Sequence, residues 1–198
     1  MLYFLAEHFT KIEFLKSIYL RAFLGFVISF CIVLFAGKPF IKYLKVKKFG
    51  EEIRDDGPSS HFSKKGTPTM GGVLIIVAVL LTSIFINDLT NTLILLVLLS
   101  MIMFAAIGFI DDYRKFTVSK KGLAGKKKLL FQAIIGLMVW AYLYFIGFTG
   151  RPMVDLALIN PISAYPYYIG AIGMFVLIQV VLMGTSNAVN ITDGLDGL

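Results

Sequence analysis

Five long apolar runs dominate this sequence and constrain its fold more than any other feature. They cover approximately residues 19–35, 70–86, 93–110, 129–148 and 167–183. Each is close to the ~20 residues that an α-helix needs to cross ~30 Å of hydrocarbon. The runs are continuously apolar rather than alternating with a period of two, which disfavours a membrane β-barrel. The sequence predicts an all-α, polytopic integral membrane protein: five transmembrane helices in one transmembrane domain, residues 1–198.

The composition supports this fold class and narrows the chemistry. The chain is 58% hydrophobic, and its mean hydropathy is +0.82, far above that of an ordinary soluble domain. Cys31 is the single cysteine and lies inside the first apolar run. One cysteine allows neither an internal disulfide nor a cysteine-rich zinc site.

Basic residues are concentrated in two of the connections between the runs, within a net charge of +7. The first connection carries Lys38, Lys42, Lys45, Lys47, Lys48, Arg54, Lys64 and Lys65, and the second carries Arg114, Lys115, Lys120, Lys121, Lys126, Lys127 and Lys128. The positive-inside rule places both connections in the cytoplasm and therefore the N-terminus outside.

Two acidic clusters follow apolar runs. Asp111 and Asp112 come after the third run, and Asp193 and Asp196 come after the fifth. With five crossings, the topology predicts that both clusters face the cytoplasm. Carboxylates beside apolar runs are costly without a partner, so they usually mark chemistry or ion handling.

The Asp111–Asp112 pair has a structural and a functional interpretation. Structurally, it is the solvated end of a helix. Functionally, adjacent aspartates at a helix C-terminus need a compensating cation, because that end carries partial negative charge. Neighbouring helical residues point about 100° apart, so one carboxylate could bind a metal while the other takes a proton.

The segment from Asn187 to Gly197 carries amides and carboxylates at helical spacing. Asn187, Asn190, Asp193 and Asp196 are each one turn apart, and such oxygen ligands suit a hard cation and a sugar or nucleotide. The alternative is an Asp-Gly turn with capping aspartates at Asp193–Gly194.

Two basic motifs allow more than one role. Thr69 could cap the second helix, or it could join Lys64 in an anion site at the helix N-terminus. The run from Lys120 to Lys128 could bind lipid headgroups or substrate phosphates. There is no Walker loop and no GxGxxG motif, and the basic patches flank membrane spans, so nucleic acid is not an expected partner.

Several of these motifs together identify a family resemblance. They are Arg54–Pro58, His61, Lys64, the run 66–72, Asp111–Lys115 and Asn187–Leu198. In this order they resemble the polyprenyl-phosphate N-acetylhexosamine 1-phosphate transferases, and the run 66–72 resembles the branch that transfers phospho-N-acetylmuramoyl-pentapeptide.

The resemblance implies a reaction, a cofactor and a location. Undecaprenyl phosphate would attack UDP-N-acetylmuramoyl-pentapeptide in the presence of Mg²⁺, giving lipid I and UMP for peptidoglycan synthesis, cell shape and division. The enzyme would lie among the lipids of the bacterial inner membrane, with its active site facing the cytoplasm. A homodimer is compatible with the sequence.

The resemblance also implies residue roles. Asp111 or Asp112 would deprotonate or orient the lipid phosphate, and Asp193 would act at the metal or the donor phosphates. The other implied contacts are Asn187 and Asn190 near Asp193, Gly194, Leu195 and Asp196 on the uridine side, and Lys64, Thr69, Lys115 and Lys127 on phosphates. Asp112 and Asp193 are the candidate metal ligands, with the main ligand expected beyond Leu198. A covalent aspartyl intermediate and direct attack by the lipid are both compatible with these residues.

Members of this family have about twice as many helices, so this piece alone is expected to be inactive. Three alternatives stay open at this point. They are a sister transferase that uses another UDP-N-acetylhexosamine, a cation-coupled transporter and a purely structural membrane subunit. Transporter sites usually lie near the middle of the bilayer, whereas these acidic clusters lie at its predicted cytoplasmic surface.

Overall fold

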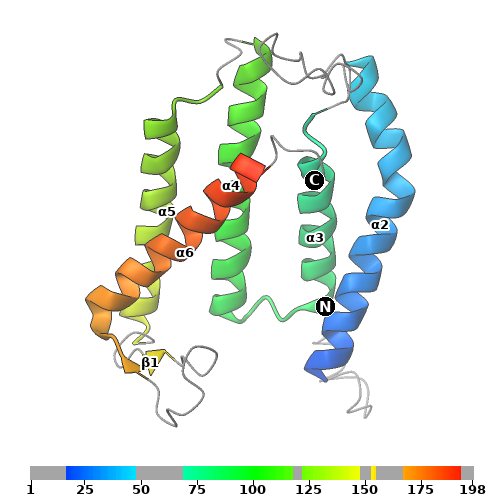
Figure 1. Cartoon of the computed structure of the whole chain (residues 1–198). Helices are drawn as coiled ribbons and strands as arrows, with labels where there is room; N and C mark the ends of the chain where they lie inside the picture. The colour runs from blue at the N-terminus through cyan, green and yellow to red at the C-terminus, as the bar shows by residue number, and fades with distance from the viewer. Residues whose placement is uncertain (1–16, 48–68, 118–121, 148–152, 155–166, 193–198) are drawn as a thin grey trace. The chain divides into compact units, whose positions relative to one another are not determined.

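The computed structural model describes residues 17–47, 69–117, 122–147, 153–154 and 167–192. Five helices account for almost all of this part of the chain (Figure 1). They are α2 (Ile18–Val46), α3 (Gly72–Ile86), α4 (Thr92–Thr117), α5 (Gly125–Phe145) and α6 (Gly170–Thr192). Two short strands, β1 (Met153–Val154) and β2 (Tyr167–Tyr168), pair antiparallel before α6. The predicted all-α fold with five helices is confirmed.

Four of the helices are long and apolar enough to cross a membrane, namely α2, α4, α5 and α6. The fifth, α3, has only 15 residues, which gives about 22 Å at 1.5 Å per residue. It begins later than the expected residue 70 because Met70 has a φ of 69°, which a right-handed helix cannot include.

The start of α3 corrects one expectation. Gly71 occupies the N-cap position, and no side chain caps the helix. The backbone carbonyls of Met70 and Gly71 accept the first bonds instead, from Val73 and Leu74. Thr69 therefore does not cap the second helix.

Helix α2 is longer than the apolar run that predicted it. The run ends near residue 35, but the helix continues to Val46 through Pro39. Proline removes only one helical hydrogen bond, and the residues that follow need not be apolar where a helix projects into water. Lys42 and Lys45 lie in this extension.

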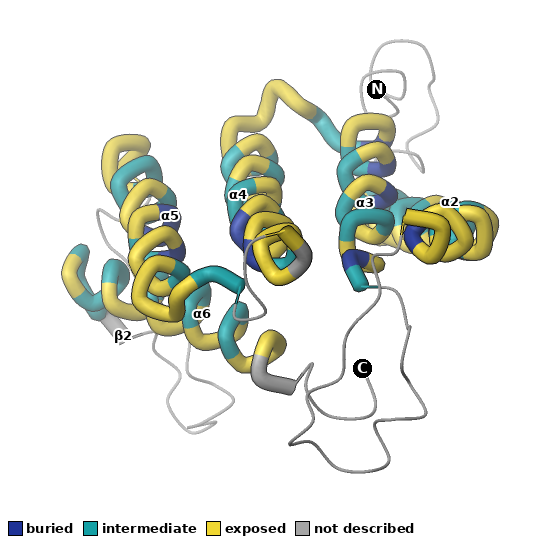
Figure 2. Tube along the Cα trace, turned by 90° about the horizontal axis from the view of Figure 1, so that it is seen from above, coloured by how far each residue is buried: buried dark blue, intermediate teal, exposed yellow. Residues whose placement is uncertain are grey.

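The described residues divide into two units, 1–122 and 123–198. In the first unit α2 packs along α3 (Figures 1 and 2). The helices of this unit alternate in direction, so the C-terminal ends of α2 and α4 lie at the same end of it (Figure 1). That alternation is what two membrane crossings between those ends require.

A tight hairpin joins α3 to α4. Asp88 Oδ1 accepts hydrogen bonds from the backbone amide of Thr90 at 2.9 Å and from its hydroxyl at 2.7 Å. Asn91 Oδ1 then accepts a bond from the amide of Leu93 at 2.9 Å. Short polar side chains in this way satisfy amides that the starting helix leaves unpaired.

The second unit is built around the pairing of α5 with α6. Trp140 on α5 donates a hydrogen bond of 2.9 Å to the carbonyl of Ala171 and meets the ring of Phe175 edge-on. Most large apolar residues of both units are exposed, as the colouring of Figure 2 indicates. Such an apolar exterior suits lipid, which cannot hydrogen-bond with polar groups.

Candidate functional site

The aspartate pair lies inside α4, not after it. The helix continues past Asp111 and Asp112 to Thr117, with Arg114 and Lys115 in its last turn. The sequence placed these carboxylates at the end of the span, and the helix extends further through Arg114 and Lys115, which have high helix propensity and are favourable near a helix C-terminus. The extension brings Lys115 one turn beyond both aspartates.

One ammonium group bridges the two carboxylates. Lys115 Nζ lies 3.2 Å from Asp111 Oδ2 and 2.9 Å from Asp112 Oδ1. Asp111 is buried, with 7% of its surface exposed, whereas Asp112 is half-buried. Ion pairs of this helical spacing typically contribute only about 0.3–0.5 kcal/mol. The stability that these ion pairs add to the fold therefore does not explain why two carboxylates occupy this position.

The three side chains together keep one negative charge, since one lysine faces two aspartates. Lys115 was predicted to contact phosphates, and in this structure it contacts Asp111 and Asp112. A phosphate or cation entering the site would compete with these contacts. Carboxylate oxygens that keep net negative charge are suitable ligands for a hard divalent cation.

Gly122 lies close to Asp111 and Lys115, and it was not among the predicted site residues. Its φ is +65°, a conformation that residues with a side chain rarely adopt. A Cβ at this position would lie 2.7 Å from Asp111 Oδ1 and 3.0 Å from Lys115 Cγ. The signal was a glycine inside the run from Lys120 to Lys128, just before α5, which could have been recognised as a point of close backbone approach.

Thr69 is described, whereas its predicted partner Lys64 lies outside the described residues. The Thr69 hydroxyl is buried and has no hydrogen-bond partner within the described part of the chain. A buried hydroxyl without a partner costs free energy. Since Thr69 does not cap α3, its predicted role in an anion site stays a prediction.

The second acidic cluster is described only at its beginning. Asn187 and Asn190 lie in the last turns of α6, so their predicted helical spacing is confirmed. Asn187 is half-buried and Asn190 is exposed. The remaining predicted residues of this cluster lie outside the described residues: Asp193, Gly194, Leu195 and Asp196.

Asn187 is held by a buried residue that the sequence analysis did not consider. Its Nδ2 donates to Gln132 Oε1 on α5 at 2.7 Å and to the carbonyl of Met183 at 2.7 Å. Gln132 is fully buried, and its Nε2 donates to Ser186 Oγ at 3.0 Å. A glutamine within an otherwise apolar membrane helix was the available signal.

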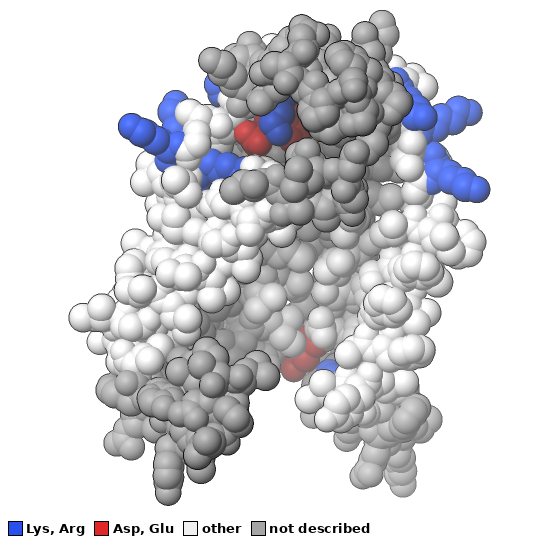
Figure 3. Space-filling view, in the orientation of Figure 1, with Lys and Arg blue, Asp and Glu red and all other residues white. Residues whose placement is uncertain are grey.

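Lys127 lies in the first turn of α5, is exposed and has lysines on both sides. No acidic residue is present in that turn. A helix N-terminus already carries partial positive charge, so this turn attracts an anion such as a phosphate. In the first unit, lysine side chains near the C-terminal end of α2 project from a surface that is otherwise uncharged in this view (Figure 3).

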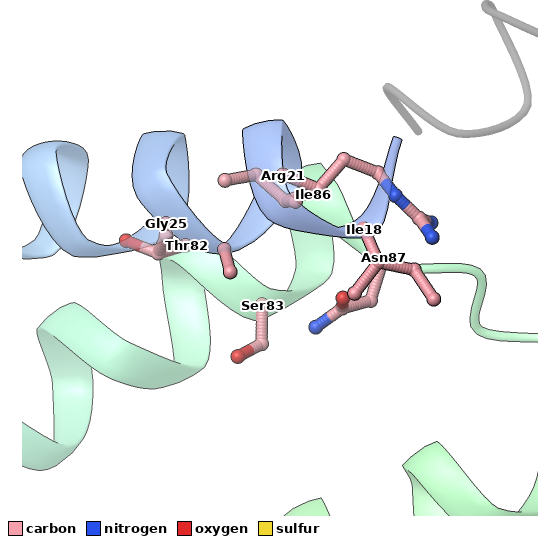
Figure 4. A pocket seen from close by; sticks show the side chains of 8 residues that line it. Ile18, Arg21, Gly25, Thr82, Ser83, Ile86 and Asn87 are labelled. Atoms are coloured by element: carbon pink, nitrogen blue, oxygen red, sulfur yellow. The ribbon is translucent and has the colours of Figure 1, made fainter. Parts of the chain in front are cut away.

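A pocket between α2 and α3 lies apart from the carboxylates. It is formed where α2 begins and α3 ends, and Figure 4 shows Arg21, Ser83 and Asn87 around it. Asp111 and Asp112 lie near the opposite end of the same unit (Figure 1). This pocket is therefore not part of the candidate site.

Of the two predicted metal ligands, one lies among the described residues. Asp112 is described and Asp193 is not. Within the described ranges, no group of three His, Cys, Asp or Glu residues is placed to hold a metal ion. Asp111 and Asp112 supply the oxygen ligands that Mg²⁺ prefers, so the residues present fit this ion.

Comparison with known proteins assigns the family. Residues 93–198 match the family described as Glycosyl transferase family 4, a range that includes the aspartate pair and the asparagines of α6. The chain belongs to glycosyl transferase family 4. Residues 64–76 also match signature 1 of the phospho-N-acetylmuramoyl-pentapeptide-transferases, the segment of the predicted phosphate-binding Lys64 and Thr69.

A curated member of the same family is similar over the whole chain. It is the phospho-N-acetylmuramoyl-pentapeptide-transferase of Fusobacterium nucleatum subsp. nucleatum, 91% identical over 198 residues. These residues are 100% of this chain and 55% of that protein, so the chain spans about half the length of its relative. The predicted resemblance is confirmed, and the chain is a polytopic membrane segment of a transferase family.

Proposed function

We propose that this chain forms part of an enzyme that transfers phospho-N-acetylmuramoyl-pentapeptide from its UDP donor to undecaprenyl phosphate. The observation that carries the proposal is the pair Asp111–Asp112, sharing Lys115 at the end of a membrane helix. Carboxylates at that place fit a reaction between a lipid-borne phosphate and a water-soluble nucleotide. The relative's printed name supports the same activity.

The reaction balances as a phosphoryl transfer. A phosphate oxygen of undecaprenyl phosphate forms a bond to the β-phosphorus of the donor. The bond between that phosphorus and the oxygen bridging to the α-phosphate breaks, and UMP leaves. Such transfers depend on positioning and charge neutralisation more than on covalent chemistry by the protein.

The residues at the end of α4 take distinct roles in this proposal. Asp112, the more exposed carboxylate, holds or removes the proton of the lipid phosphate. Asp111 is buried and, through Lys115, keeps the local charge fixed. Lys115 exchanges its contact with one of the two carboxylates for a contact with a substrate phosphate.

The remaining residues are proposed to bind the donor. Lys127 and the N-terminus of α5 attract the phosphates, and the buried hydroxyl of Thr69 donates to one of their oxygens. Asn187 and Asn190 are proposed to bind the same donor, and the further proposed contacts are Lys64, Asp193, Gly194, Leu195 and Asp196. Asp112 and Asp193 are the proposed ligands of Mg²⁺, which when bound neutralises charge on the phosphates.

The alternatives of the sequence analysis are less well supported. The match of residues 64–76 to the muramoyl signature favours this donor over another UDP-N-acetylhexosamine. Membership of a glycosyl transferase family favours an enzyme over a cation-coupled transporter or a structural subunit. We also propose the bacterial inner membrane as the location, with the site on the cytoplasmic side.

The test uses a full-length protein, in which the chain is continued to the length of its relative. UMP release is measured with UDP-N-acetylmuramoyl-pentapeptide, undecaprenyl phosphate and Mg²⁺. Asp112→Asn and Asp193→Asn should each reduce release about 100-fold or more, as expected for loss of an acid–base group. Thermal unfolding midpoints should change little.

Asp88→Asn is the matched control, because Asp88 is an aspartate of the α3–α4 hairpin whose carboxylate accepts hydrogen bonds from Thr90 and has no role in the proposed site. It should retain full release. Unchanged release by Asp112→Asn in a folded protein would remove the assignment.

A further inference from the structure

Gln132 is the largest side chain that is fully buried among the described residues. Its carboxamide lies between α5 and α6, where α6 carries Ser186 and Asn187. Burying an amide among apolar helices is unfavourable unless each polar atom has a partner. Both ends of this amide are satisfied, and one of the partners is a proposed site residue.

The bonds of Asn187 determine which way its own amide points. Its Nδ2 faces the carbonyl of Met183 and Gln132 Oε1, both at 2.7 Å. A carbonyl oxygen only accepts, so the atom that faces Met183 must be the nitrogen. Both hydrogens of that nitrogen are then used, and the Oδ1 atom points away from them.

The Oδ1 atom of Asn187 is the atom of this side chain that can contact a substrate or a metal ion. Within the described residues, Asn187 Oδ1 accepts no hydrogen bond. Asn187 is half-buried, and Asn190 is exposed one turn further along α6. An amide oxygen at this position can accept a hydrogen bond from a substrate or serve as a hard-cation ligand.

We infer that Gln132 is a positioning residue, which orients the Asn187 carboxamide so that its Oδ1 faces the substrate. This inference rests on the proposed function. Gln132 itself is fully buried and touches no substrate; it acts through Asn187.

The alternative is that Gln132 only holds α5 and α6 together. The same helix pair contains a residue, Gln179, that serves as a control for this structural role. Gln179 on α6 donates to the backbone carbonyl of Ala133 on α5 at 3.1 Å. It therefore crosses the same interface without bonding to a proposed site residue. Gln132→Met and Gln179→Met are a matched pair, because each removes one amide and keeps side-chain length.

The experiment measures kcat and the KM for the donor by UMP release, together with thermal unfolding midpoints, in the full-length protein. Gln132→Met should lower kcat about 10- to 100-fold, the range typical of losing a residue that orients a ligand. The donor KM should change by less than about threefold. Gln179→Met should keep kcat near that of the unaltered protein while lowering the midpoint by a similar amount.

A second variant covers the case in which Gln132→Met does not fold. Ser186→Ala removes the acceptor of Gln132 Nε2 and leaves Asn187 and Gln132 in place, so it should lower kcat by a smaller factor. In an Asn187→Ala background, Gln132→Met should cause no further loss of kcat.

The outcomes separate this inference from the proposed function. An unaltered full-length protein that releases no UMP overturns the proposed function and the inference with it. A protein that releases UMP, but loses no more kcat with Gln132→Met than with Gln179→Met, overturns the inference alone. So does an unchanged kcat in Ser186→Ala, if Gln132→Met does not fold.

Discussion

The end of α4 and the interior of the α5–α6 pair handle polar groups in opposite ways. At the end of α4, two carboxylates are balanced by one half-exposed lysine, and net charge remains. Between α5 and α6, the polar groups are uncharged amides and a hydroxyl, and they form hydrogen bonds with one another and with a backbone carbonyl. Charge is costly in hydrocarbon, and here it is retained at the end of a helix, where Lys115 is exposed.

The two regions also differ in what their glycines do. Gly122 lets a loop backbone approach Asp111, whereas Gly136 lets the Gln179 carboxamide fit against α5. The first glycine shapes the surroundings of a charge, and the second shapes the contact between helices. Substitutions at these glycines test the comparison directly.

The largest expected effect on stability is at Gly136. A Cβ there would lie 2.5 Å from Gln179 Oε1, so Gly136→Ala should push α5 and α6 apart. Overpacking of this kind costs about 1–3 kcal/mol. Gly184→Ala on α6 is the control, because nothing lies within 4 Å of its added Cβ.

In the control, the higher helix propensity of alanine should leave the protein as stable as before or more stable. Thermal unfolding in detergent micelles compares the two variants. Equal midpoints would show that the amide-paired interior is not tightly packed, contrary to the comparison.

A smaller effect is expected at Gly122. Gly122→Ala adds the left-handed backbone cost of roughly 1–2 kcal/mol and a Cβ 2.7 Å from Asp111 Oδ1. Gly147→Ala carries the same backbone cost at a φ of +76°, with nothing within 4 Å of its Cβ. The difference between the variants isolates the contact with Asp111.

Both variants should lower the thermal midpoint, and Gly122→Ala should in addition lower UMP release in the full-length protein. Release that falls equally in both variants would mean that Gly122 matters only for its backbone conformation. The carboxylate end of α4 would then not depend on this close approach.

The smallest effect concerns Asp88, a carboxylate that is paired without any lysine. Hydrogen bonds from the hydroxyl and then the amide of Thr90 hold the pKa of Asp88 below its usual value. A lowered pKa stabilises the folded protein above the unfolded value of about 3.9. This contribution is lost as the pH falls through the folded pKa.

The thermal midpoint of the unaltered protein should therefore fall more steeply below about pH 4 than that of Asp88→Asn. Thr90→Val should give an intermediate slope, because it removes the hydroxyl donor and keeps the amide. Parallel pH profiles for all three proteins would contradict the assignment of this pKa shift to Thr90.

Much of the fold and the identity of the acidic site follow from the sequence alone. Continuous apolar runs of spanning length leave the backbone no alternative to helices in lipid, and all five predicted helices are present. The pairing of Asp111 with Asp112 beside Lys115 is local, because residues three and four apart in a helix are neighbours. The family match over residues 93–198 confirms what these motifs indicated.

Other features depended on contacts between distant residues, and only the tertiary structure decided them. Gln132 lies 55 positions from Asn187, and no local pattern indicates which amide it meets across a helix pair. The late start of α3 depends on the backbone at Met70, and the role of Gly122 depends on its close approach to Asp111. Hydrophobic runs determine which segments become helices, but side-chain packing determines which polar atoms meet between them.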